Sequence, residues 1–513
     1  MQRPGGKIGF WVGLAGFLAM LLWGNFSPER PEAHRMAAIA VLMATWWVTD
    51  AIPLAATALL PLVLFPLLGI LPGKEVAPLY MNYVIFLFLG GFLIALAMER
   101  WNLHRRIALS IVSVIGSQPS RLVLGFMIAT AFLSMWISNT ATTIMMLAIA
   151  MAVIRQAEDS FGTNDTANLS VALLLGIAYS ASIGGLATLV GTPPNLALVR
   201  IFDLSFPAAA HAGDTLSFGQ WMLFGVPLAV VLLAMVWVVL TQVVFRSPVH
   251  LALDPGVVER EKQKLGPLQY EEKVVGGVFA ATAALWVFRQ DLQLGSVRLP
   301  GWSGLLPYGS GIDDGTIAIA MAATLFLIPA RRQAQPAAGH GSILDGDVFA
   351  RVPWGIILLF GGGFALAKGF QTSGLSEWIG SHFADFEHAP TWVLVGAITA
   401  GITFLTELTS NTATTEMILP VLASISTAAH IHPLLLMIPA AVAASCAFMM
   451  PVATPPNAIV FGSGRIHISQ MVKAGLLINL GGIVVVTILF LTLGITVFRI
   501  DPSSLPAWAS AAG

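Results

Sequence analysis

The sequence predicts an all-α polytopic membrane protein, with about 11 transmembrane helices and two re-entrant hairpins arranged in two inverted-topology repeats. Three observations carry this prediction: an apolar composition, two apolar segments too long for one helix, and an ordered internal repeat. Of the 513 residues, 57% are hydrophobic and 10% are charged, whereas a soluble chain carries about 25% charged residues. So few charges cannot cover an aqueous surface, and the composition therefore favours a chain embedded in a bilayer.

Apolar segments recur along the whole chain, and several reach the roughly 20 residues that span hydrocarbon. Two of them, 122–154 and 391–427, exceed that length and hold a polar cluster in the middle. Non-helical backbone at membrane depth persists only where protein or a water-filled cavity covers it. We therefore expect each of these segments to form a hairpin that enters and leaves on one side of the membrane.

The predicted crossings are odd in number, so the two termini lie on opposite sides. With the N-terminus inside, most of the 25 Lys and Arg residues fall on the inner side, as the positive-inside rule requires. We therefore expect a multi-pass protein of the cell (inner or plasma) membrane, with a cytoplasmic N-terminus and the C-terminus outside. The polar stretches 246–273 and 331–351 are typical of solvated linkers.

The two halves of the chain resemble each other. Three pairs of motifs occur in the same order in each half: LFLGGFLIA at 87–95 with LFGGGFALA at 359–367, SNTATTIMM at 138–146 with SNTATTEMI at 410–418, and TPPN at 192–195 with TPPN at 454–457. Reuse of small residues in membrane segments explains the first pair alone. On the predicted topology the hairpins open from opposite sides, and inverted repeats of this kind are typical of secondary transporters with a site near the midplane.

The repeated polar residues suit a small anion together with small cations. Hydroxyl and carboxamide groups donate to anion oxygens or accept toward a cation. At a hairpin, free backbone carbonyls can ligate Na⁺, while helix N-termini face a carboxylate. The prolines of each TPPN break a second helix nearby. A lone Pro-Pro is more often a kink, and a lone Ser-Asn-Thr more often joins helices, but their ordered co-occurrence in both halves favours a binding site.

Two acidic residues flank the second Ser-Asn-Thr motif. Glu407 and Glu416 have the non-acidic counterparts Met135 and Ile144 in the first half. An intramembrane carboxylate is a functional candidate. Orientation of the hairpin, a salt bridge and proton coupling all stay open for these two side chains.

Other functional classes find little support. The sequence holds no metal-ligand spacing, nucleophile elbow, phosphate-binding loop or dinucleotide fingerprint, so we do not expect an enzyme or an organic cofactor. The single cysteine, Cys446, excludes an intramolecular disulfide and a cysteine-rich metal site. A formal net charge of −1 gives no reason to expect nucleic acid as a partner.

The paired SNT motifs, each followed by a TPPN-bearing broken helix, resemble those of the divalent anion/sodium symporter family. GGFLIALAMERWNLHRRIAL (90–109) and FLTELTSNTATT (404–415) are similar to its sodium-coupled dicarboxylate branch. The resemblance implies a homodimer in which each protomer pairs a scaffold with a transport domain that moves as an elevator. The corresponding divisions are 1–120 (scaffold), 121–245 (transport), 246–273 (cytoplasmic linker), 274–388 (scaffold) and 389–513 (transport).

The resemblance also implies a substrate and its ligands. It implies Na⁺-coupled uptake of C4-dicarboxylates (succinate, fumarate, malate); Na⁺-independent exchange, or transport of citrate or sulfate, stays open on the same fold. One Na⁺ site would fall on Ser134, Ser138, Asn139 and Gly191, and another on Thr406, Thr409, Asn411 and Ala453. The dianion would be held by Asn139, Thr140, Ser410, Asn411 and Thr412, with Thr192, Thr454 and Pro455 closing the pocket.

Overall fold

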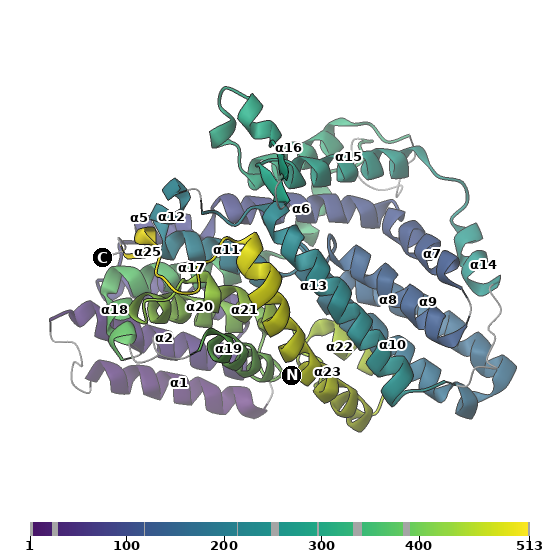
Figure 1. Cartoon of the computed structure of the whole chain (residues 1–513), viewed down its shortest axis with the longest axis horizontal. Helices are drawn as coiled ribbons and strands as arrows, with labels where there is room; N and C mark the ends of the chain where they lie inside the picture. Colours follow the sequence, from purple (N-terminus) through teal and green to yellow (C-terminus); the bar gives the residue numbers. More distant parts are fainter. Residues whose placement is uncertain are drawn as a thin grey trace.

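The computed structural model describes residues 4–22, 29–116, 118–212, 214–247, 256–294, 297–331, 341–382 and 390–510. These residues are almost entirely helical, as the sequence predicts. Within the described ranges the one sheet is a short antiparallel pair, β1 (Leu292–Leu294) and β2 (Val297–Leu299). In Figure 1 the connection that carries this pair protrudes beside α15 and α16.

The first half of the chain holds the helices up to the polar linker (Figure 1). Their bounds are α1 Pro4–Leu22, α2 Pro31–Thr49, α3 Leu54–Thr57, α4 Leu60–Leu67, α5 Gly73–Val76, the 3-10 turn η1 Ala77–Tyr80, α6 Tyr83–Arg100, α7 Leu103–Ile115, α8 Pro119–Ser134, α9 Asn139–Phe161, α10 Thr163–Leu186, α11 Pro193–Ser205, α12 Pro207–Ala212, α13 Phe218–Val238 and the π-helical segment η2 Val239–Val244.

The second half begins after the linker and repeats much of this order. Its bounds are α14 Gly256–Lys264, α15 Tyr270–Val287, the 3-10 turns η3 Trp302–Leu305 and η4 Gly309–Gly311, α16 Asp314–Leu327, the 3-10 turn η5 Gly346–Arg351, α17 Trp354–Ser373, α18 Leu375–Ser381, α19 Thr391–Thr406, α20 Asn411–Ala428, α21 Leu434–Ala444, α22 Pro455–Phe461, α23 Ile468–Leu489, the π-helical segment η7 Phe490–Gly494, α24 Ile495–Val497 and α25 Ala507–Ser510.

Six helical stretches are long and apolar enough to cross a membrane: Gly73–Arg100, Asn139–Phe161, Thr163–Leu186, Phe218–Val244, Trp354–Ser373 and Ile468–Val497. Six shorter apolar helices accompany them among the described residues. These helices agree with a multi-pass membrane protein. The number of crossings, the sidedness of the termini and the re-entrant path of the hairpins stay predictions.

The two long apolar segments each form a helix-turn-helix. The first consists of α8, a turn and α9, and the second of α19, a turn and α20. We call residues 134–140 the first tip and residues 406–412 the second tip. Each tip ends one helix and begins the next at the Asn of its SNT motif.

The two TPPN motifs interrupt helices, as predicted. The chain leaves α10 at Leu186 and re-enters a helix at Pro193, and it leaves α21 at Ala444 and re-enters at Pro455. Proline suits the first position of a helix because its missing N–H would have no partner there. We call residues 187–192 the first break and residues 445–454 the second break.

The repeat seen in the sequence extends to the element order. Helices α6, α8, α9, α10, α11 and α13 of the first half find counterparts in α17, α19, α20, α21, α22 and α23 of the second. Both α13 and α23 continue into a π-helical segment, a rare form that the sequence analysis did not foresee. Figure 1 shows these two helices crossing the same face of the molecule, where they pack on each other.

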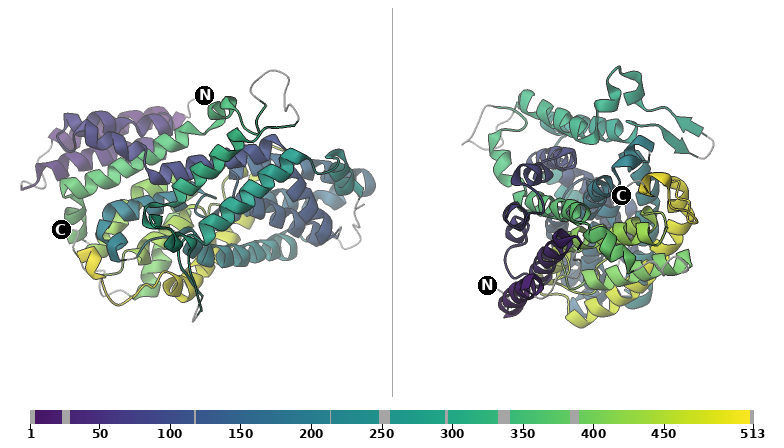
Figure 2. Two further views of the ribbon diagram at one scale, coloured as in Figure 1. Left: turned by 90° about the horizontal axis from the view of Figure 1, so that it is seen from above. Right: turned by 90° about the vertical axis from the view of Figure 1, so that its left-hand side faces the viewer.

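The tips and breaks are partly buried among packed helices, with Leu408 of the second tip and Val452 of the second break exposed. Helix α10 is buried along its whole hydrophobic window and packs on α8, α9, α13 and α22. Helix α1 lies at the periphery and packs on α2 (Figure 2). Helices α6, α15 and α16 form a second group, visible together in Figure 1.

The predicted linkers are more ordered than expected. Within 246–273, helix α14 is held to α7 by an ion pair of 2.6 Å between Arg105 and Glu261. Arg106 pairs with Glu272 at 2.8 Å near the start of α15. The ammonium of Lys264 and the guanidinium of Arg105 hold the pKa of Glu261 below its usual value. Residues 248–255 and 332–340 of the two predicted linkers lie outside the described residues.

Candidate functional site

A cavity of about 550 Å³ lies where the two tips and the two breaks meet. Its polar lining comes from both halves of the chain. The tips, the breaks and the helix starts that follow the breaks contribute Trp136, Ser138, Asn139, Thr140, Val190, Gly191, Thr192, Pro193, Pro194, Leu408, Thr409, Ser410, Asn411, Thr412, Val452, Ala453, Thr454, Pro455 and Pro456. The structure thus brings together at one place the four non-helical points that the sequence predicted.

The remaining wall of the cavity is mostly apolar. Trp47 on α2, Phe88 and Phe92 on α6, and Ile356 and Leu359 on α17 contribute to it. A cavity with a few convergent polar groups and an otherwise apolar wall is the usual form of a small-molecule site. The larger of these side chains close the space around the two tips.

The cavity carries little formal charge. Among the described residues that line it, Asp50 is the one with an ionisable side chain. No Lys or Arg lies in this lining, so an anion bound here must be stabilised by dipoles, hydrogen bonds or accompanying cations.

Four helices begin at the cavity wall. Helix α9 starts at Asn139, α20 at Asn411, α11 at Pro193 and α22 at Pro455. The side chains of the N-cap residues Ser138, Ser410 and Thr192 make no capping hydrogen bond to their own helices. Free N–H groups and the partial positive charge of helix N-termini favour an anion.

Oxygen atoms gather behind the first tip. The Ser134 hydroxyl donates to the Ala181 carbonyl at 2.6 Å and lies 2.5 Å from the side-chain oxygen of Asn139. That oxygen also faces the Ala181 and Gly191 carbonyls, each at 3.3 Å. Turning the amide by half a rotation directs its nitrogen, which has two N–H donors, at these three groups. The two orientations differ in which end of the amide faces the oxygen cluster.

Gly185 allows this close approach. A Cβ atom at position 185 would lie 3.0 Å from the Gly191 carbonyl oxygen and 3.1 Å from the Asn139 side-chain oxygen. These distances are tighter than ordinary van der Waals contact, so a side chain here would press on the cluster. Glycine at 185 therefore keeps room beside the first tip.

The second tip repeats the arrangement of the first. The Thr406 hydroxyl lies 2.7 Å from the side-chain oxygen of Asn411 and 2.9 Å from the Ala444 carbonyl, and its one proton can be donated to either acceptor. Thr406 and Asn411 stand where Ser134 and Asn139 stand in the first tip. The sequence repeat is therefore also a repeat of hydrogen bonds.

Amide and indole donors stabilise the first break. The side-chain nitrogen of Asn195 donates to the Thr188 carbonyl at 2.8 Å and to the Gly185 carbonyl at 3.2 Å. Trp221 donates to the Leu186 carbonyl at 2.9 Å. These bonds satisfy the carbonyls that the end of α10 leaves without helical partners.

A carboxylate stabilises the second break. Glu407 accepts hydrogen bonds from the backbone N–H groups of Phe448, Met449 and Met450 at 2.6–2.9 Å, and from the Asn479 amide at 2.8 Å. Asn457 donates to the Ala447 and Met450 carbonyls, each at 3.1 Å. Glu407 therefore orients the break through hydrogen bonds, and no salt bridge to it occurs within the part of the chain that the structure describes.

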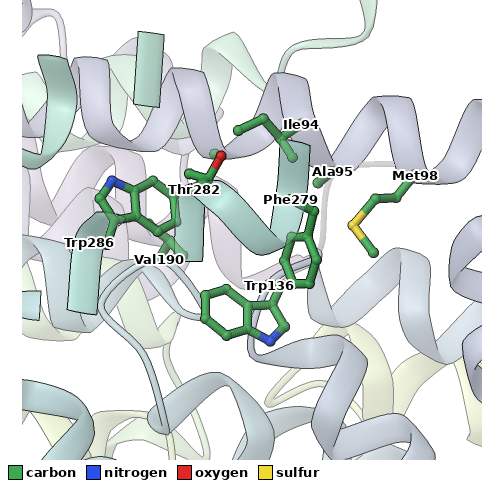
Figure 3. Close-up of a pocket in the computed structure, with 9 residues that line it drawn as sticks. Ile94, Ala95, Met98, Trp136, Val190, Phe279, Thr282 and Trp286 are labelled. Carbon is green, nitrogen blue, oxygen red and sulfur yellow. The ribbon is translucent and has the colours of Figure 1, made fainter. Parts of the chain in front are cut away.

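The aromatic side chains of Trp136, Phe279 and Trp286 pack beside the first tip. Figure 3 shows Trp136 next to Phe279, with Val190 and Trp286 nearby. The rings of Trp136 and Phe279 are 5.1 Å apart and nearly perpendicular. Trp136 and Val190 line both the main cavity and a small void of about 10 Å³ against α6 and α15. The void has room for about one water molecule, so this wall is closely packed.

The predicted site residues fall into two groups. Most line the cavity: Ser138, Asn139, Thr140, Gly191, Thr192, Thr409, Ser410, Asn411, Thr412, Ala453, Thr454 and Pro455. Ser134 and Thr406 do not line it but lie fully buried behind the tips, each bonded to its Asn. The Thr409 hydroxyl bonds to the Leu405 carbonyl and to Thr414.

Sequence reasoning missed several parts of the site. The carbonyls of Ala181 and Ala444 carry no side-chain signal, so nothing in the sequence marked them. The repeated Asn of TPPN did point to Asn195 and Asn457, although not to their carbonyl partners. The apolar wall formed by Trp47, Phe88 and Phe92 comes from distant helices and has no motif of its own.

Known proteins resemble this chain over most of its length. The family described as the sodium:sulfate symporter transmembrane region matches residues 13–500. A protein of Staphylococcus saprophyticus, the sodium-dependent dicarboxylate transporter SdcS, is 44% identical over 506 residues, which cover 97% of this chain and 93% of that protein. SdcS of Staphylococcus aureus strain RF122 is 44% identical over 492 residues, covering 95% and 91% respectively.

Solved structures share the fold at low identity. MtrF of Neisseria gonorrhoeae, described with a class of antimetabolite efflux pumps, has a TM-score of 0.59 and 15% identity, covering 96% of this chain and all of that one. The YdaH transporter of Alcanivorax borkumensis has a TM-score of 0.56 and 15% identity, covering 98% and 100%. At this identity the likeness concerns the fold alone.

Proposed function

Because the chain belongs to the family of the sodium:sulfate symporter transmembrane region, we propose that it is a secondary transporter which couples Na⁺ entry to uptake of a C4-dicarboxylate such as succinate, fumarate or malate. The observation that carries the proposal is the cavity itself. Two tips with the same hydrogen bonds and four helix starts meet there, without a basic side chain in the described lining. The names of the SdcS relatives support sodium and a dicarboxylate.

The first Na⁺ would bind at the oxygen cluster of Ser134, Asn139, Ala181 and Gly191. Four oxygens that face one another without enough donors repel, and a small cation between them removes the repulsion. The Asn139 amide oxygen would coordinate the bound ion, and in the turned orientation the amide nitrogen faces the Ala181 and Gly191 carbonyls. The second Na⁺ would bind in the same way beside Thr406, Asn411 and Ala444, with Thr409 and Ala453 near it.

The dianion would lie between the two tips. Thr140, Thr412 and the two Asn side chains supply donors, and the uncapped first turns of α9 and α20 supply N–H groups. Thr192, Thr454 and Pro455 would form the opposite side of the pocket. Two bound Na⁺ ions balance a dianion, and this balance explains how a cavity without Lys or Arg can hold it.

Uptake into proteoliposomes tests the proposal. We expect saturable uptake of labelled succinate that requires an inward Na⁺ gradient, and competition by fumarate and malate. Uptake that is unchanged when Na⁺ is replaced by K⁺ would support anion exchange instead and refute the sodium coupling. Competition by citrate or sulfate alone would assign one of these alternative substrates, and single-channel currents without saturable uptake would indicate a channel.

The elevator movement has its own test. Residues 121–245 and 389–513 would move as the transport domain against the scaffold, and Tyr83 on α6 is hydrogen-bonded to Asp203 on α11 across that boundary. Cys446 is the single native cysteine, so a Cys446→Ser background gives a chain free of thiols. In it, we expect a thiol-specific bifunctional reagent with a reducible bridge, joining the cysteines of a Tyr83→Cys/Asp203→Cys double variant, to stop uptake, and reduction of the bridge to restore it. Full uptake by completely cross-linked protein would refute this movement.

The proposed homodimer can be measured by mass in detergent. We expect twice the mass of the chain, and a monomeric mass with full uptake activity after reconstitution would contradict it. In the proposed dimer, the second protomer would cover part of the apolar surface of the described helices, and the lipid bilayer would cover the rest.

A further inference from the structure

Glu416 is an acidic residue buried in an apolar environment. It lies on α20, five residues after Asn411, and none of its surface is exposed. Neither carboxyl oxygen has a hydrogen-bond partner among the described residues. Gly363 on α17 packs directly on this carboxyl, and a Cβ atom at that position would collide with it. The side chain therefore lies in the interface between α17 and α20.

No described positive charge pairs with this carboxyl. Helix α20 packs on α2, α11, α17, α18, α19 and α21, and none of the titratable groups on these helices is hydrogen-bonded or ion-paired to Glu416. Those groups are Glu32, His34 and Arg35 on α2, Arg200 and Asp203 on α11, Lys368 on α17 and Glu377 on α18.

Most of these groups have partners of their own. Arg35 pairs with Glu32, and Glu377 pairs with Arg30. Asp203 is bonded to Tyr83, and Lys368 donates to Gln371 at 3.2 Å. Helices α19 and α21 carry no titratable side chain within their bounds. Arg200 lies over the Tyr83 ring, and no hydrogen bond from a charged group of the described chain reaches Glu416.

Glu407 shows what an ionised carboxylate requires in this molecule. Like Glu416, the Glu407 side chain is buried, with 4% of its surface exposed, but it accepts four hydrogen bonds. A buried carboxylate without such donors costs far more than a neutral carboxylic acid. Glu416 has no donors, so its neutral form is the one that this arrangement stabilises.

The surroundings also decide between a proton and a metal cation. Na⁺ requires several oxygen ligands, as in the clusters beside Asn139 and Asn411. Glu416 has no polar atom of the described chain within hydrogen-bonding distance of either oxygen. A proton needs the carboxyl alone.

We propose that Glu416 is a proton-binding site in the interface between α17 and α20, and that the conformation seen here requires the bound proton. In the division proposed above, α17 belongs to the scaffold and α20 to the transport domain, so the contact lies where the two would slide. Loss of the proton would place a bare charge against Gly363 and open this interface. Protonation of Glu416 therefore regulates the proposed transport cycle. This regulation rests on the proposed function, but the assignment of Glu416 as a proton-binding site does not depend on it.

Infrared spectroscopy tests the proton site without transport. We expect the wild-type protein at neutral pH to show a carboxylic-acid carbonyl band that is missing in Glu416→Gln. Glutamine keeps the shape of the side chain and is neutral at every pH. Identical spectra in the carboxylic-acid region would overturn the proposal. If Glu416→Gln does not fold, Glu416→Met provides the same spectral comparison with an apolar side chain of similar length.

Uptake at alkaline pH tests the consequence. Between pH 7 and pH 9 a dicarboxylate is fully ionised, so a change in rate reflects the protein. We expect wild-type uptake to fall at least about twofold at the alkaline end of this range, and Glu416→Gln to show no such decline. Superimposable pH profiles of the two proteins would refute the regulation. Absence of wild-type uptake at pH 7 would instead refute the proposed function and leave the infrared result decisive for the site.

Discussion

In the first half of the molecule the break after α10 is stabilised by the amide of Asn195 and the indole of Trp221, whereas in the second half the break after α21 is stabilised by the carboxylate of Glu407. The tips themselves are alike. Ser134 and Asn139 make the same contacts as Thr406 and Asn411. The two halves therefore share the hydrogen bonds of their tips, and they differ in the side chains that stabilise their breaks.

Chain length explains the difference. The first break runs from 187 to 192, while the second runs from 445 to 454 and leaves more backbone N–H groups outside a helix. A carboxylate accepts several hydrogen bonds at once, so one side chain at 407 satisfies three consecutive N–H groups. The shorter first break mainly needs donors for its carbonyls, which amide and indole groups provide.

Removing the tip amides tests the similarity of the two halves. We expect Asn139→Ala and Asn411→Ala each to reduce uptake to background, because each change removes the central group of an oxygen cluster. Proteoliposome uptake measures the loss, and membrane insertion with an unchanged elution profile shows that the chain still folds. Wild-type uptake by either variant would contradict the placement of the sites, and loss in one variant alone would show that the tips are not equivalent.

Glu407 provides the test of the difference. We expect Glu407→Met, which introduces the residue found at the corresponding position 135, to leave four buried donors unpaired at a cost of about 1–3 kcal/mol each. The melting temperature in detergent would fall by roughly 4–11 °C, since a chain of this length loses about 1 °C per kcal/mol. Met135→Leu is the matched control and should melt within a few degrees of the wild type. Equal melting of both variants would remove the assigned role of Glu407.

Sequence alone predicted the parts of the site that are formed by motifs repeated in both halves of the chain. The SNT motifs and the TPPN motifs are local, and proline and the helix-start residues act through their immediate neighbours, so the tips and breaks appeared at the predicted places. The aromatic and aliphatic wall could not be predicted, because Trp47, Phe88 and Leu359 are ordinary membrane residues until the helices assemble.

The roles of the two glutamates also depended on the assembled fold. Glu407 finds its donors 41–43 and 72 positions away in the chain, and Glu416 meets Gly363 on another helix. The sequence left orientation, a salt bridge and proton coupling open for both. The hydrogen bonds of Glu407 fit the first of these roles. Glu416 differs, because neither of its carboxyl oxygens has a hydrogen-bond partner in the part of the chain that the structure describes.

The asparagines of the two TPPN motifs allow a finer comparison. We expect Asn195→Ala to destabilise the protein by about 1–3 kcal/mol, because the carbonyls of Gly185 and Thr188 lose their donor. Asn457→Ala should cost less, since Glu407 also fixes the second break. Melting curves of the two variants give the ranking. A larger loss for Asn457→Ala would show that the carboxylate does not support the break independently.

Gly185 allows the smallest change that affects one half alone. Its counterpart is Ala447, because the amides of Asn195 and Asn457 donate to the carbonyls at these two positions. We expect Gly185→Ala to press on Asn139 and Gly191 and to weaken Na⁺ activation of uptake by about tenfold, equivalent to about 1.4 kcal/mol. Ala447→Gly, the reciprocal control, should leave Na⁺ activation near wild type, because it removes a methyl group and adds no contact. The Na⁺ concentration at half-maximal uptake measures both. An unchanged value for Gly185→Ala would mean that the space beside Asn139 is not an ion site, and that the two tips share a hydrogen-bond pattern without sharing a ligand.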